Sequence, residues 1–600
     1  RDKKTGLSRS PYYDTYHDVD IDVEWLRWRI DTPAVVMSAI IGSSTHEMDL
    51  ESSNFYDESR FVALQGISDQ HPLAQMKMFI DKRNNKQRDF NISDYVSYVH
   101  LDEFDVKNQL ILLANFGFID IDFNSGRIVA KDKLYHYLYA KSKKEDYDNI
   151  SIHSDIADKP NATLFLTDSC DMIVRGVKKV MLSEGRKVYF QPMYGEIVLH
   201  KNRDMTFGGA IKSGMFEFFG KQFDFKYDEF KIEVLNADSV RMFAPTIDQT
   251  VEGKIQMKRV ESTIERSYGR IFIDKPFNKS GIKIDSFPSY PIYVSDSISK
   301  VFFDKRNEQG KAYARSKVYF TIKPFTIDSL NTLDRSSINF DGTFASGGIF
   351  PDFEETLRVQ NDHSLGFKHP APKDGLPIYG GKAKYFNEIN VSNRGIRGNG
   401  AMEYITSTAV SDDFVFFVDS VNAVAKTFDV KERKDGVEYP SAAGTNLKFH
   451  FEPYKDKLWA GVITKPIDLY GTQAKLKGTM IYGTEKMGGF GAVDFENAVL
   501  TSKDFDFKNR KFKADTSDFK LKAAQGTEQD GAIAFATKNV KSTIDFDKRE
   551  GEFIANGGAS FVDFPVNQYV CYMDQFKWFM DKYELELSTS KGEAKAADGA

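Results

Sequence analysis

Six hundred residues are enough for several domains, and the composition is globular, with 41% apolar and 28% charged residues. The net charge of −6 argues against a nucleic-acid-binding protein, which would carry a basic patch or a high isoelectric point. No apolar run approaches the roughly 20 residues that a spanning helix needs, so we expect no membrane-spanning segment.

Aromatic residues make up 14% of the chain, with 50 Phe and 28 Tyr, and such side chains suit half-buried pleated surfaces. Apolar and polar residues alternate along much of the chain, as in a strand with one wet face. The clearest cases are 223–228, 230–234, 447–451, 505–508 and 519–523. We therefore predict a mainly β fold of elongated, stacked antiparallel repeats. The repeats would form a jellyroll or folded-over sheet, or a solenoid.

Residues 1–66 are predicted as a β segment that continues a truncated repeat. The chain opens Arg1-Asp2-Lys3 without an initiator Met and ends in an Ala-rich tail, which is typical of an internal fragment. The run 18–24 places four carboxylates on one face of a strand. Calcium could use such oxygens, but the usual loop with a Gly turn is absent. We predict the solvated outer face of an edge strand.

Residues 67–146 break the β pattern and predict a helical insert with a β-hairpin wing. An amphipathic run follows His71 to residue 82, Ser93 is placed as the cap of a second helix, and Asp105 as the cap of a third. Gly117 ends the third helix, and a hairpin follows over 118–130. Helices followed by a wing resemble a winged-helix unit. The last helix offers a single basic residue, Lys107, so a packing or docking insert is preferred over DNA binding.

Three further β-repeat regions are predicted, at 147–330, at 331–446 with long loops, and at 447–600 with a truncated end. Polar stretches at 142–161, 362–381 and 431–446 are predicted as exposed linkers.

Internal repetition supports this organisation. Four segments, beginning at Gly208, Gly398, Gly488 and Asn556, share glycines, an apolar strand, a polar turn and an aromatic-alternating strand. Each unit of such an array exposes an apolar face that only its neighbour can bury. In addition, 23–31 resembles 575–581, which suggests the same strand of one repeat unit near both ends of the chain.

No catalytic motif is found. The glycines of 395–400 lack the Lys-Ser/Thr pair of a phosphate loop, so a bend between strands is predicted. Neither HExxH, a Cys/His cluster nor GxSxG occurs. The neighbouring Glu354 and Glu355 would point to opposite faces of a strand. We expect no catalytic residue, no metal site and no cofactor. Cys170 and Cys571 are expected to be small buried or half-buried residues, with a disulfide as the alternative.

One aromatic cluster has two interpretations. It is either a packed sheet core or an apolar groove able to hold an acyl chain. The candidate groove residues are Phe216, Phe218, Phe223, Phe225, Tyr227 and Phe230.

The segment 543–561, with Ile544-Asp545-Phe546-Asp547 ahead of Asn556-Gly557-Gly558-Ala559, resembles the repeat of the OstA-like (organic solvent tolerance) family. Residues 505–515 give a second approximate match. The resemblance implies a β-jellyroll or folded-over sheet with an apolar interior. It also implies the periplasm or outer-membrane side of a Gram-negative envelope, where that family bridges lipopolysaccharide transport. The helical insert departs from the family. The general style also resembles very large uncharacterised envelope proteins of these bacteria.

The leading functional expectation is a non-catalytic envelope scaffold or bridge, with lipid or other envelope proteins as partners. The alternative is a module that binds glycan or lipid at the cell surface or in the periplasm. In that case exposed aromatics would serve as stacking platforms, namely Trp25, Trp28, Trp459 and Trp578. A polysaccharide-active β-solenoid enzyme ranks third.

Overall fold

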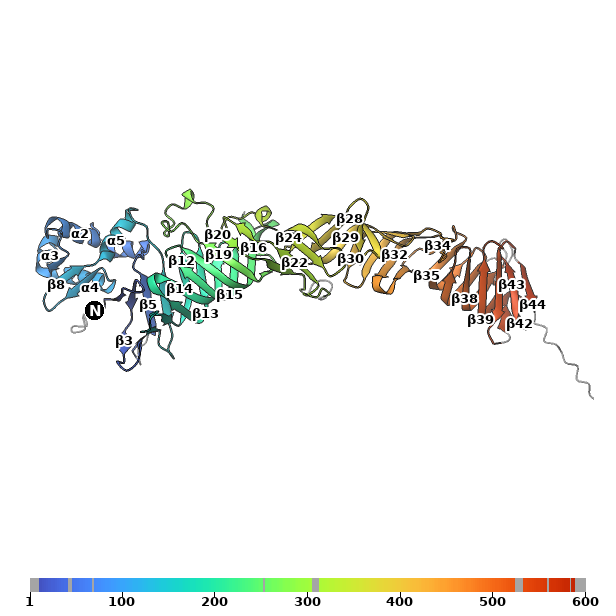
Figure 1. Ribbon diagram of the computed structural model, residues 1–600, viewed down its shortest axis with the longest axis horizontal. Coiled ribbons are helices and arrows are strands. Elements are labelled where there is room, and N and C mark those ends of the chain that lie inside the picture. The colour runs from blue at the N-terminus through green and yellow to red at the C-terminus, as the bar shows by residue number, and fades with distance from the viewer. Residues whose placement is uncertain are drawn as a thin grey trace, which may run out of the picture. The chain divides into compact units, whose positions relative to one another are not determined.

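The computed structural model describes residues 10–40, 46–66, 69–251, 254–304, 312–523, 532–557, 560–582 and 584–588 (Figure 1). These residues form two compact units. Unit 1 comprises Arg1–Val301, Thr321–Gly342 and His363–Leu365, and unit 2 comprises Phe302–Phe320, Thr343–Asp362 and Gly366–Ala600. Within the described residues there are 44 strands and five α-helices. The predicted fold class is confirmed: the chain is mainly β, with stacked antiparallel strands and one small helical insert.

The strands of unit 1 follow one another closely, and three of them also carry residues of unit 2. They are β1 (Tyr12–Asp14), β2 (Val19–Asp22), β3 (Trp25–Trp28), β4 (Ala34–Ser38), β5 (Glu47–Ser52), β9 (Ser151–Asp155), β10 (Ala162–Phe165), β11 (Met172–Val174), β12 (Val177–Ser183), β13 (Val188–Leu199), β14 (Met205–Ser213), β15 (Phe216–Lys226), β16 (Lys231–Val251), β17 (Lys254–Arg259), β18 (Ile264–Glu265), β19 (Ser267–Phe272), β20 (Ile292–Ser295), β21 (Ser299–Phe302), β22 (Val318–Ile322), β23 (Phe325–Ile327) and β24 (Asn339–Ser346).

Short strands in unit 1 form two columns that converge on one long strand. The first column runs β1, β2, β5, β9 and β12, and the second runs β3, β4, β10 and β11. Strand β13 pairs with β12 through Val188–Phe190 and with β11 through Ile197–Leu199. A long strand therefore spans both columns, and β14 and β15 continue the ladder in the same way.

The helical insert lies between β5 and β9 and gathers at the blue end of the chain (Figure 1). It consists of α1 (Glu58–Gln65), α2 (Pro72–Lys82), β6 (Asp89–Asn91), α3 (Ile92–Val99), α4 (Glu103–Asn115), β7 (Ile119–Asp122), β8 (Arg127–Ala130) and α5 (Asp132–Lys141). A three-stranded sheet in the order β6-β8-β7 and a common apolar core hold these elements together. Helices α2 to α4 followed by the β7–β8 hairpin match the winged-helix arrangement predicted from the sequence.

Both predicted helix caps of the insert are misplaced by a few residues. Asn91, not Ser93, caps α3, because its side chain accepts a hydrogen bond from the Ser93 backbone N–H at 3.2 Å. Asp102, not Asp105, caps α4 by accepting from the Phe104 N–H at 3.0 Å. In each case a second residue of a type that caps helices lies two or three positions further along the chain.

Unit 2 continues the antiparallel series. Its strands are β25 (Phe353–Val359), β26 (Leu365–Pro370), β27 (Leu376–Ile378), β28 (Ala383–Ser392), β29 (Gly395–Tyr404), β30 (Ser407–Phe416), β31 (Val421–Val430), β32 (Ala442–Glu452), β33 (Lys457–Val462), β34 (Ile467–Leu469), β35 (Ala474–Gly483), β36 (Met487–Asp494), β37 (Ala498–Phe507), β38 (Lys511–Lys522), β39 (Ile533–Asp545), β40 (Glu550–Ala555), β41 (Ser560–Phe564), β42 (Tyr569–Met573), β43 (Gln575–Phe579) and β44 (Glu584–Ser588). No helix in the described part of the chain has the length and apolar character needed to cross a membrane.

Three of the four predicted glycine-led repeats share one bulge. The strand register shifts at Gly209, Gly400 and Gly491, and each of these glycines has a φ between +127° and +139°. A side chain at Gly400 would place its Cβ 2.2 Å from the Phe386 carbonyl oxygen, so only glycine fits. In all three repeats the residue opposite is small, and a buried Phe follows it three positions later: Phe223, Phe414 and Phe505. The fourth repeat includes Gly558 and Ala559, which lie outside the described residues.

One four-strand unit occurs near both ends of the described chain. Strands β41–β44 repeat β1–β4. Trp578 and Trp28 differ by 550 in residue number, and adding 550 to the residue pairs of β1–β2 and β3–β4 gives the residue pairs of β41–β42 and β43–β44. Leu26 is opposite Met37 as Phe576 is opposite Leu587. Asp18 and Gln568, at equivalent turn positions, both have left-handed φ values, of 61° and 53°. The predicted equivalence of 23–31 and 575–581 is confirmed.

The predicted linkers are exposed loops only in part, because each also contains strand. Strand β9 lies within 142–161, β26 and β27 lie within 362–381, and β31 and β32 reach into or border 431–446. Asp148, in the first of these stretches, is fully buried. The polar composition of this stretch predicted exposure, but Asp148 is hydrogen-bonded inside the fold.

Candidate functional site

A surface hollow with a volume of about 1090 Å³ lies in unit 2, on the outer face of β30–β33 and β35. We call it the Trp459 hollow. Its lining comprises Ser411, Asp412, Asp413, Val415, Asn422, Ala423, Val424, Lys426, Lys448, Phe449, His450, Trp459, Gly461, Ile463 and Thr479.

Strand alternation brings these side chains to one face. Along β32, Leu447, Phe449 and Phe451 are buried, whereas Lys448 and His450 point to the other side. The same period of two applies to the neighbouring strands. The side chains of the inner face therefore form the core, whereas those of the outer face are available to form a binding site.

Register places the outward residues in lateral rows. In one row Asn422 of β31 is opposite His450 of β32, which is opposite Trp459 of β33. In the adjacent row Lys448 is opposite Gly461, which is opposite Thr479 of β35. Gly461 has no side chain, so a gap opens beside the Trp459 ring.

Neutral and charged polar side chains surround this gap. Nδ1 of His450 donates to Oδ1 of Asn422 at 2.6 Å, and the imidazole lies 5.3 Å from the Trp459 ring, tilted by 43°. Lys426 forms an exposed ion pair with Asp412 at 2.7 Å, and Asp413 pairs with Arg397.

Apolar groups form part of the rim. Val424 is 53% exposed and Ile463 is 49% exposed, while Trp459 is half-buried. The hollow thus combines an aromatic surface with donors and acceptors at fixed positions. Apolar and aromatic side chains with a few placed polar groups are typical of small-molecule sites.

The six predicted groove residues lie elsewhere, on and just after β15 in unit 1. Phe216, Phe218, Phe223, Phe225, Tyr227 and Phe230 are each between 0% and 2% exposed. They pack on one another and on β20: the Phe225 and Phe230 rings are 6.2 Å apart, and Phe218 lies 4.8 Å from Tyr293 of β20. They do not line the Trp459 hollow, and a lipid groove at these residues stays a prediction.

The four tryptophans proposed as stacking platforms differ in exposure. Trp25 and Trp28 are 39% and 55% exposed, and Trp459 is half-buried in its hollow. Trp578 is fully buried, so its assignment as an exposed platform is wrong. It packs against Phe495 and Phe519 at ring distances of 5.1 and 5.4 Å.

The carboxylate run 18–24 belongs to β2 and its flanks. Strand β2 pairs with β1 and with β5, so the predicted edge strand is wrong. Asp20 lies 2.8 Å from the buried Lys133 of α5, and Asp18 lies 2.7 Å from the buried Arg203. These carboxylates neutralise buried cations instead of facing solvent.

The Lys133 contact is part of a network that the sequence did not reveal. Glu51 of β5 binds Lys133 at 2.9 Å and Arg60 of α1 at 2.5 Å, so β2, β5, α1 and α5 are joined. Burial favours a raised pKa for Glu51, but the Arg60 hydrogen bond and the Lys133 charge outweigh it and lower that pKa to about 2. The sequence signal that could have indicated this network is Lys133, which lies within the apolar pattern of 132–141.

A second buried polar group, Asp148, contacts β5 through Ser52. Asp148 accepts hydrogen bonds from Ser52 and Tyr227, both at 2.7 Å, and burial raises its pKa. The Arg203 guanidinium lies over the Tyr227 ring at 3.8 Å. All polar partners belong to the fold, so we assign this group a structural role.

Other sequence candidates carry no site. Gly395–Gly400 lie in β29, which pairs on both sides, so the predicted bend between strands is wrong. Glu354 and Glu355 are neighbours on β25, and Glu355 contacts His369 at 2.9 Å. Cys170 and Cys571 are half-buried and free. The described ranges contain no group of three side chains able to hold a metal ion.

The chain matches no protein-family model, and it has no significant match among curated proteins.

Proposed function

We propose that the chain is a non-catalytic scaffold built from stacked β repeats. The observation that carries this proposal is the four-strand unit that recurs in the same register at β1–β4 and β41–β44. The glycine bulge shared by three further segments supports it. Repetition of this kind extends a sheet by adding like units, each burying the apolar face of the one before.

Two measurements test this scaffold: the radius of gyration of the chain and its catalytic activity on polysaccharides. A compact globular chain of this length would have a radius of gyration of about 25 Å. We expect small-angle scattering of monomeric protein to give a clearly larger value, since stacked repeats extend in one direction. A value near 25 Å contradicts the scaffold. Release of reducing sugar from any polysaccharide in a substrate panel contradicts its non-catalytic nature.

The Trp459 hollow favours a second function, the binding of a neutral glycan. A sugar ring presents an apolar C–H face that stacks on indole, and hydroxyls that both donate and accept. Trp459 supplies the ring, while His450, Asn422 and Lys448 supply the polar partners in adjoining rows. The mixed charges around the hollow suit a neutral ligand better than an anion.

This function is tested by binding to a glycan panel. We expect Trp459→Ala to weaken binding at least tenfold, because loss of a stacked aromatic removes roughly 1.5–3 kcal/mol. Trp28→Ala is the matched control, since it removes an exposed indole outside the hollow. Equal affinity of wild type and Trp459→Ala, or binding lost equally in both variants, contradicts a site at Trp459.

A location in a Gram-negative envelope and a lipid or protein partner there rest on the OstA-like resemblance of 543–561. They are part of the scaffold proposal, and the scattering experiment does not depend on them.

A further inference from the structure

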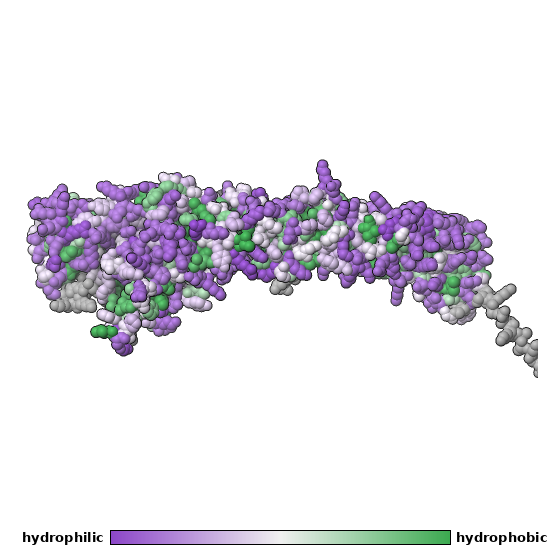
Figure 2. Space-filling model, viewed as in Figure 1, coloured by the Kyte–Doolittle hydropathy of each residue, from purple (hydrophilic) through white to green (hydrophobic). Residues whose placement is uncertain are grey.

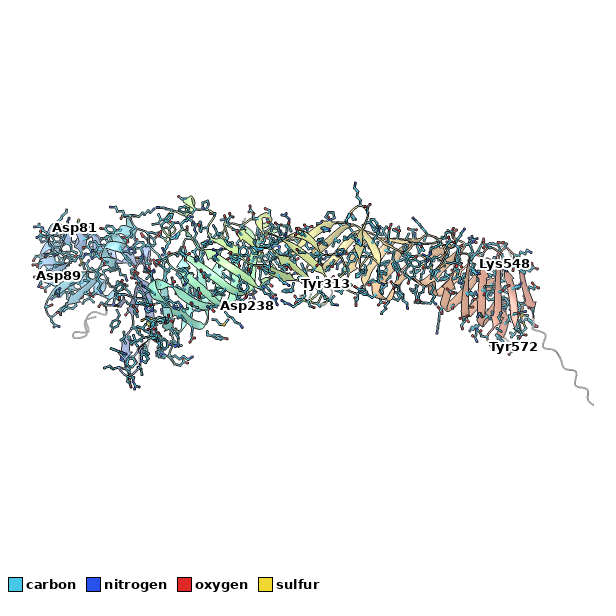
Figure 3. All side chains as sticks on the ribbon, in the orientation of Figure 1. Asp81, Asp89, Asp238, Tyr313, Lys548 and Tyr572 are labelled. Carbon is cyan, nitrogen blue, oxygen red and sulfur yellow. The ribbon has the colours of Figure 1, made fainter. Side chains whose placement is uncertain are left out.

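Strands β29–β38 bury their aromatic side chains with two exceptions. Residues 395–522 are all described, and every Phe, Tyr and Trp on these strands is at most 2% exposed except Trp459 and Phe490. Tyr313 of the same unit, labelled in Figure 3, is likewise buried, and its hydroxyl donates to the Phe416 carbonyl oxygen at 2.7 Å. The face of the chain shown in Figure 2 is mainly hydrophilic. The two outward rings therefore depart from the pattern of these strands.

Phe490 is not required by the repeat in which it lies. It directly precedes the bulge glycine Gly491 on β36, and the residues at the equivalent position of the other two repeats are Gly208 and Asn399. The bulge thus forms without an aromatic residue before it. The stability of the bulge therefore does not account for the Phe490 ring, which is 44% exposed.

Register places Phe490 beside the Trp459 hollow. Thr479 of β35, which lines the hollow, is opposite Gly461 of β33 on one side. On its other side Thr479 is opposite Phe490 of β36. Opposite residues of paired strands project from the same face of the sheet. The row of outward residues therefore continues past the hollow to Phe490.

Few side chains separate the two rings. In the adjacent row Trp459 is opposite Ile481, which is opposite Gly488. The rings thus occupy opposite corners of a grid of two rows on three strands, and Gly461 and Gly488 occupy the other two corners. A Cβ added at Gly461 would meet no atom closer than 3.4 Å. Within this grid only Thr479 and Ile481, both half-buried, lie between the rings.

The separation of the two rings suits alternate residues of a linear glycan. Neighbouring strands are ~4.8 Å apart and a residue rises ~3.4 Å along a strand, so two strands and two residues place the Cα atoms of Trp459 and Phe490 about 12 Å apart. A pyranose unit lengthens an extended glycan by about 5 Å, close to one strand spacing. A sugar stacked on each ring therefore leaves room for one sugar between them.

Polar partners lie at the other end of this path. From Trp459 the row continues through His450 of β32 to Asn422 of β31, over two further strand spacings. The imidazole and the amide donate to and accept from hydroxyl groups. An acyl chain gains nothing from such partners, and the mixed charges around the hollow do not suit an anion. These features favour a neutral glycan that crosses the strands.

We propose that the Trp459 hollow is one part of an extended site for a linear neutral glycan, which crosses β31–β36 and stacks a second sugar on Phe490. The proposal rests on the glycan binding proposed for the hollow and specifies its ligand. Four strand spacings between β31 and β36 correspond to an oligosaccharide of about five residues. A monosaccharide or disaccharide occupies the hollow alone.

The dependence of affinity on glycan length tests this proposal. The probes are linear neutral oligosaccharides of the cello-, xylo-, manno- and malto-series, from disaccharide to hexasaccharide, and isothermal titration calorimetry gives each Kd. We expect wild-type affinity to rise up to about the pentasaccharide and then to level off. Phe490→Ala should weaken hexasaccharide binding about tenfold, because a stacked ring is lost, and should leave the shortest oligosaccharide that binds unaffected.

Three variants serve as controls. Trp459→Ala should weaken binding at every length, because the sugar in the hollow is common to all of them. Phe490→Tyr keeps an aromatic face and should bind the hexasaccharide like the wild type. Phe561→Ala removes a Phe of similar exposure, 52%, from β41 and should also bind like the wild type.

The outcomes separate this proposal from the one on which it rests. Hexasaccharide binding that Trp459→Ala weakens and Phe490→Ala leaves unchanged overturns the extended site but not the glycan site at Trp459. An equal loss for short and long oligosaccharides in Phe490→Ala also overturns the extended site, because Phe490 would then act on the hollow itself. If no oligosaccharide binds the wild type, both proposals are overturned.

Discussion

The charge network that joins the helical insert to unit 1 gives the sharpest stability prediction. Glu51 binds Arg60 at 2.5 Å and Lys133 at 2.9 Å, and its side chain is 15% exposed. A pKa lowered from 4.5 to about 2 corresponds to about 3 kcal/mol of stability at neutral pH. We therefore expect Glu51→Gln to destabilise docking of α1 and α5 by about 3 kcal/mol. This agrees with the usual cost of removing one partner of a buried pair.

The measurement is native-state hydrogen exchange, because a chain with two units has no single free energy of unfolding. Amides of α1 and α5 report the local opening. Glu103→Gln is the matched control, since Glu103 pairs with Lys107 on the exposed side of α4 at 2.7 Å. We expect that control to change the opening free energy by less than about 0.5 kcal/mol.

The pH dependence gives an independent check. Because the folded-state pKa of Glu51 is below its unfolded value, the contribution is complete above about pH 4.5 and is lost as the pH falls towards 2. Glu51→Gln should remove this part of the acid sensitivity. Unchanged exchange of α1 and α5 in Glu51→Gln, or the same acid-induced loss in both proteins, would refute the reasoning.

Two further substitutions test the repeat architecture by hydrogen exchange. Gly491→Ala places a Cβ 2.4 Å from the Lys477 carbonyl oxygen at a φ of +127°, so we expect a loss of about 2 kcal/mol or more in β35–β37. Gly461→Ala, whose Cβ would meet its nearest neighbour at 3.4 Å, should cost far less, and equal effects would contradict the bulge argument. Trp578→Ala should cost about 3–5 kcal/mol around β43, whereas the equivalent Trp28→Ala should cost less than about 1 kcal/mol. Similar losses at the two tryptophans would mean that their surroundings do not differ as described.

Local patterns predicted most of the fold because they depend on neighbours along the chain. The alternation at 223–228 falls in and just after β15, that at 447–451 in β32, and that at 519–523 in and just after β38. The insert was predicted from helix periodicity and from Gly117, which has the positive φ expected of a helix end. The short helix α1, only eight residues long and weakly amphipathic, was missed.

Exposure could not be predicted in the same way. Trp28 and Trp578 lie in equivalent strands, yet one is 55% exposed and the other fully buried. The difference comes from whether a further strand lies alongside, which is set by pairing between distant segments. The prediction of an edge strand at 18–24 failed for the same reason, since β2 pairs with β5, which follows two further strands along the chain. The Trp459 hollow could not be predicted either, because it depends on the register of the five strands β30–β33 and β35.

The repeat architecture itself indicates where function can reside. Inward residues are fixed by stacking, as the buried Phe223, Phe414 and Phe505 at equivalent positions illustrate. Outward residues carry no such constraint, so a departure from the usual charged surface there needs another explanation. The outward row Asn422, His450 and Trp459 beside Gly461 is one such departure. Ligand binding, as proposed for the outward face, and packing of the inward face are thus separable, and a substitution in the outward row that abolishes binding should leave the stacking of the repeats intact.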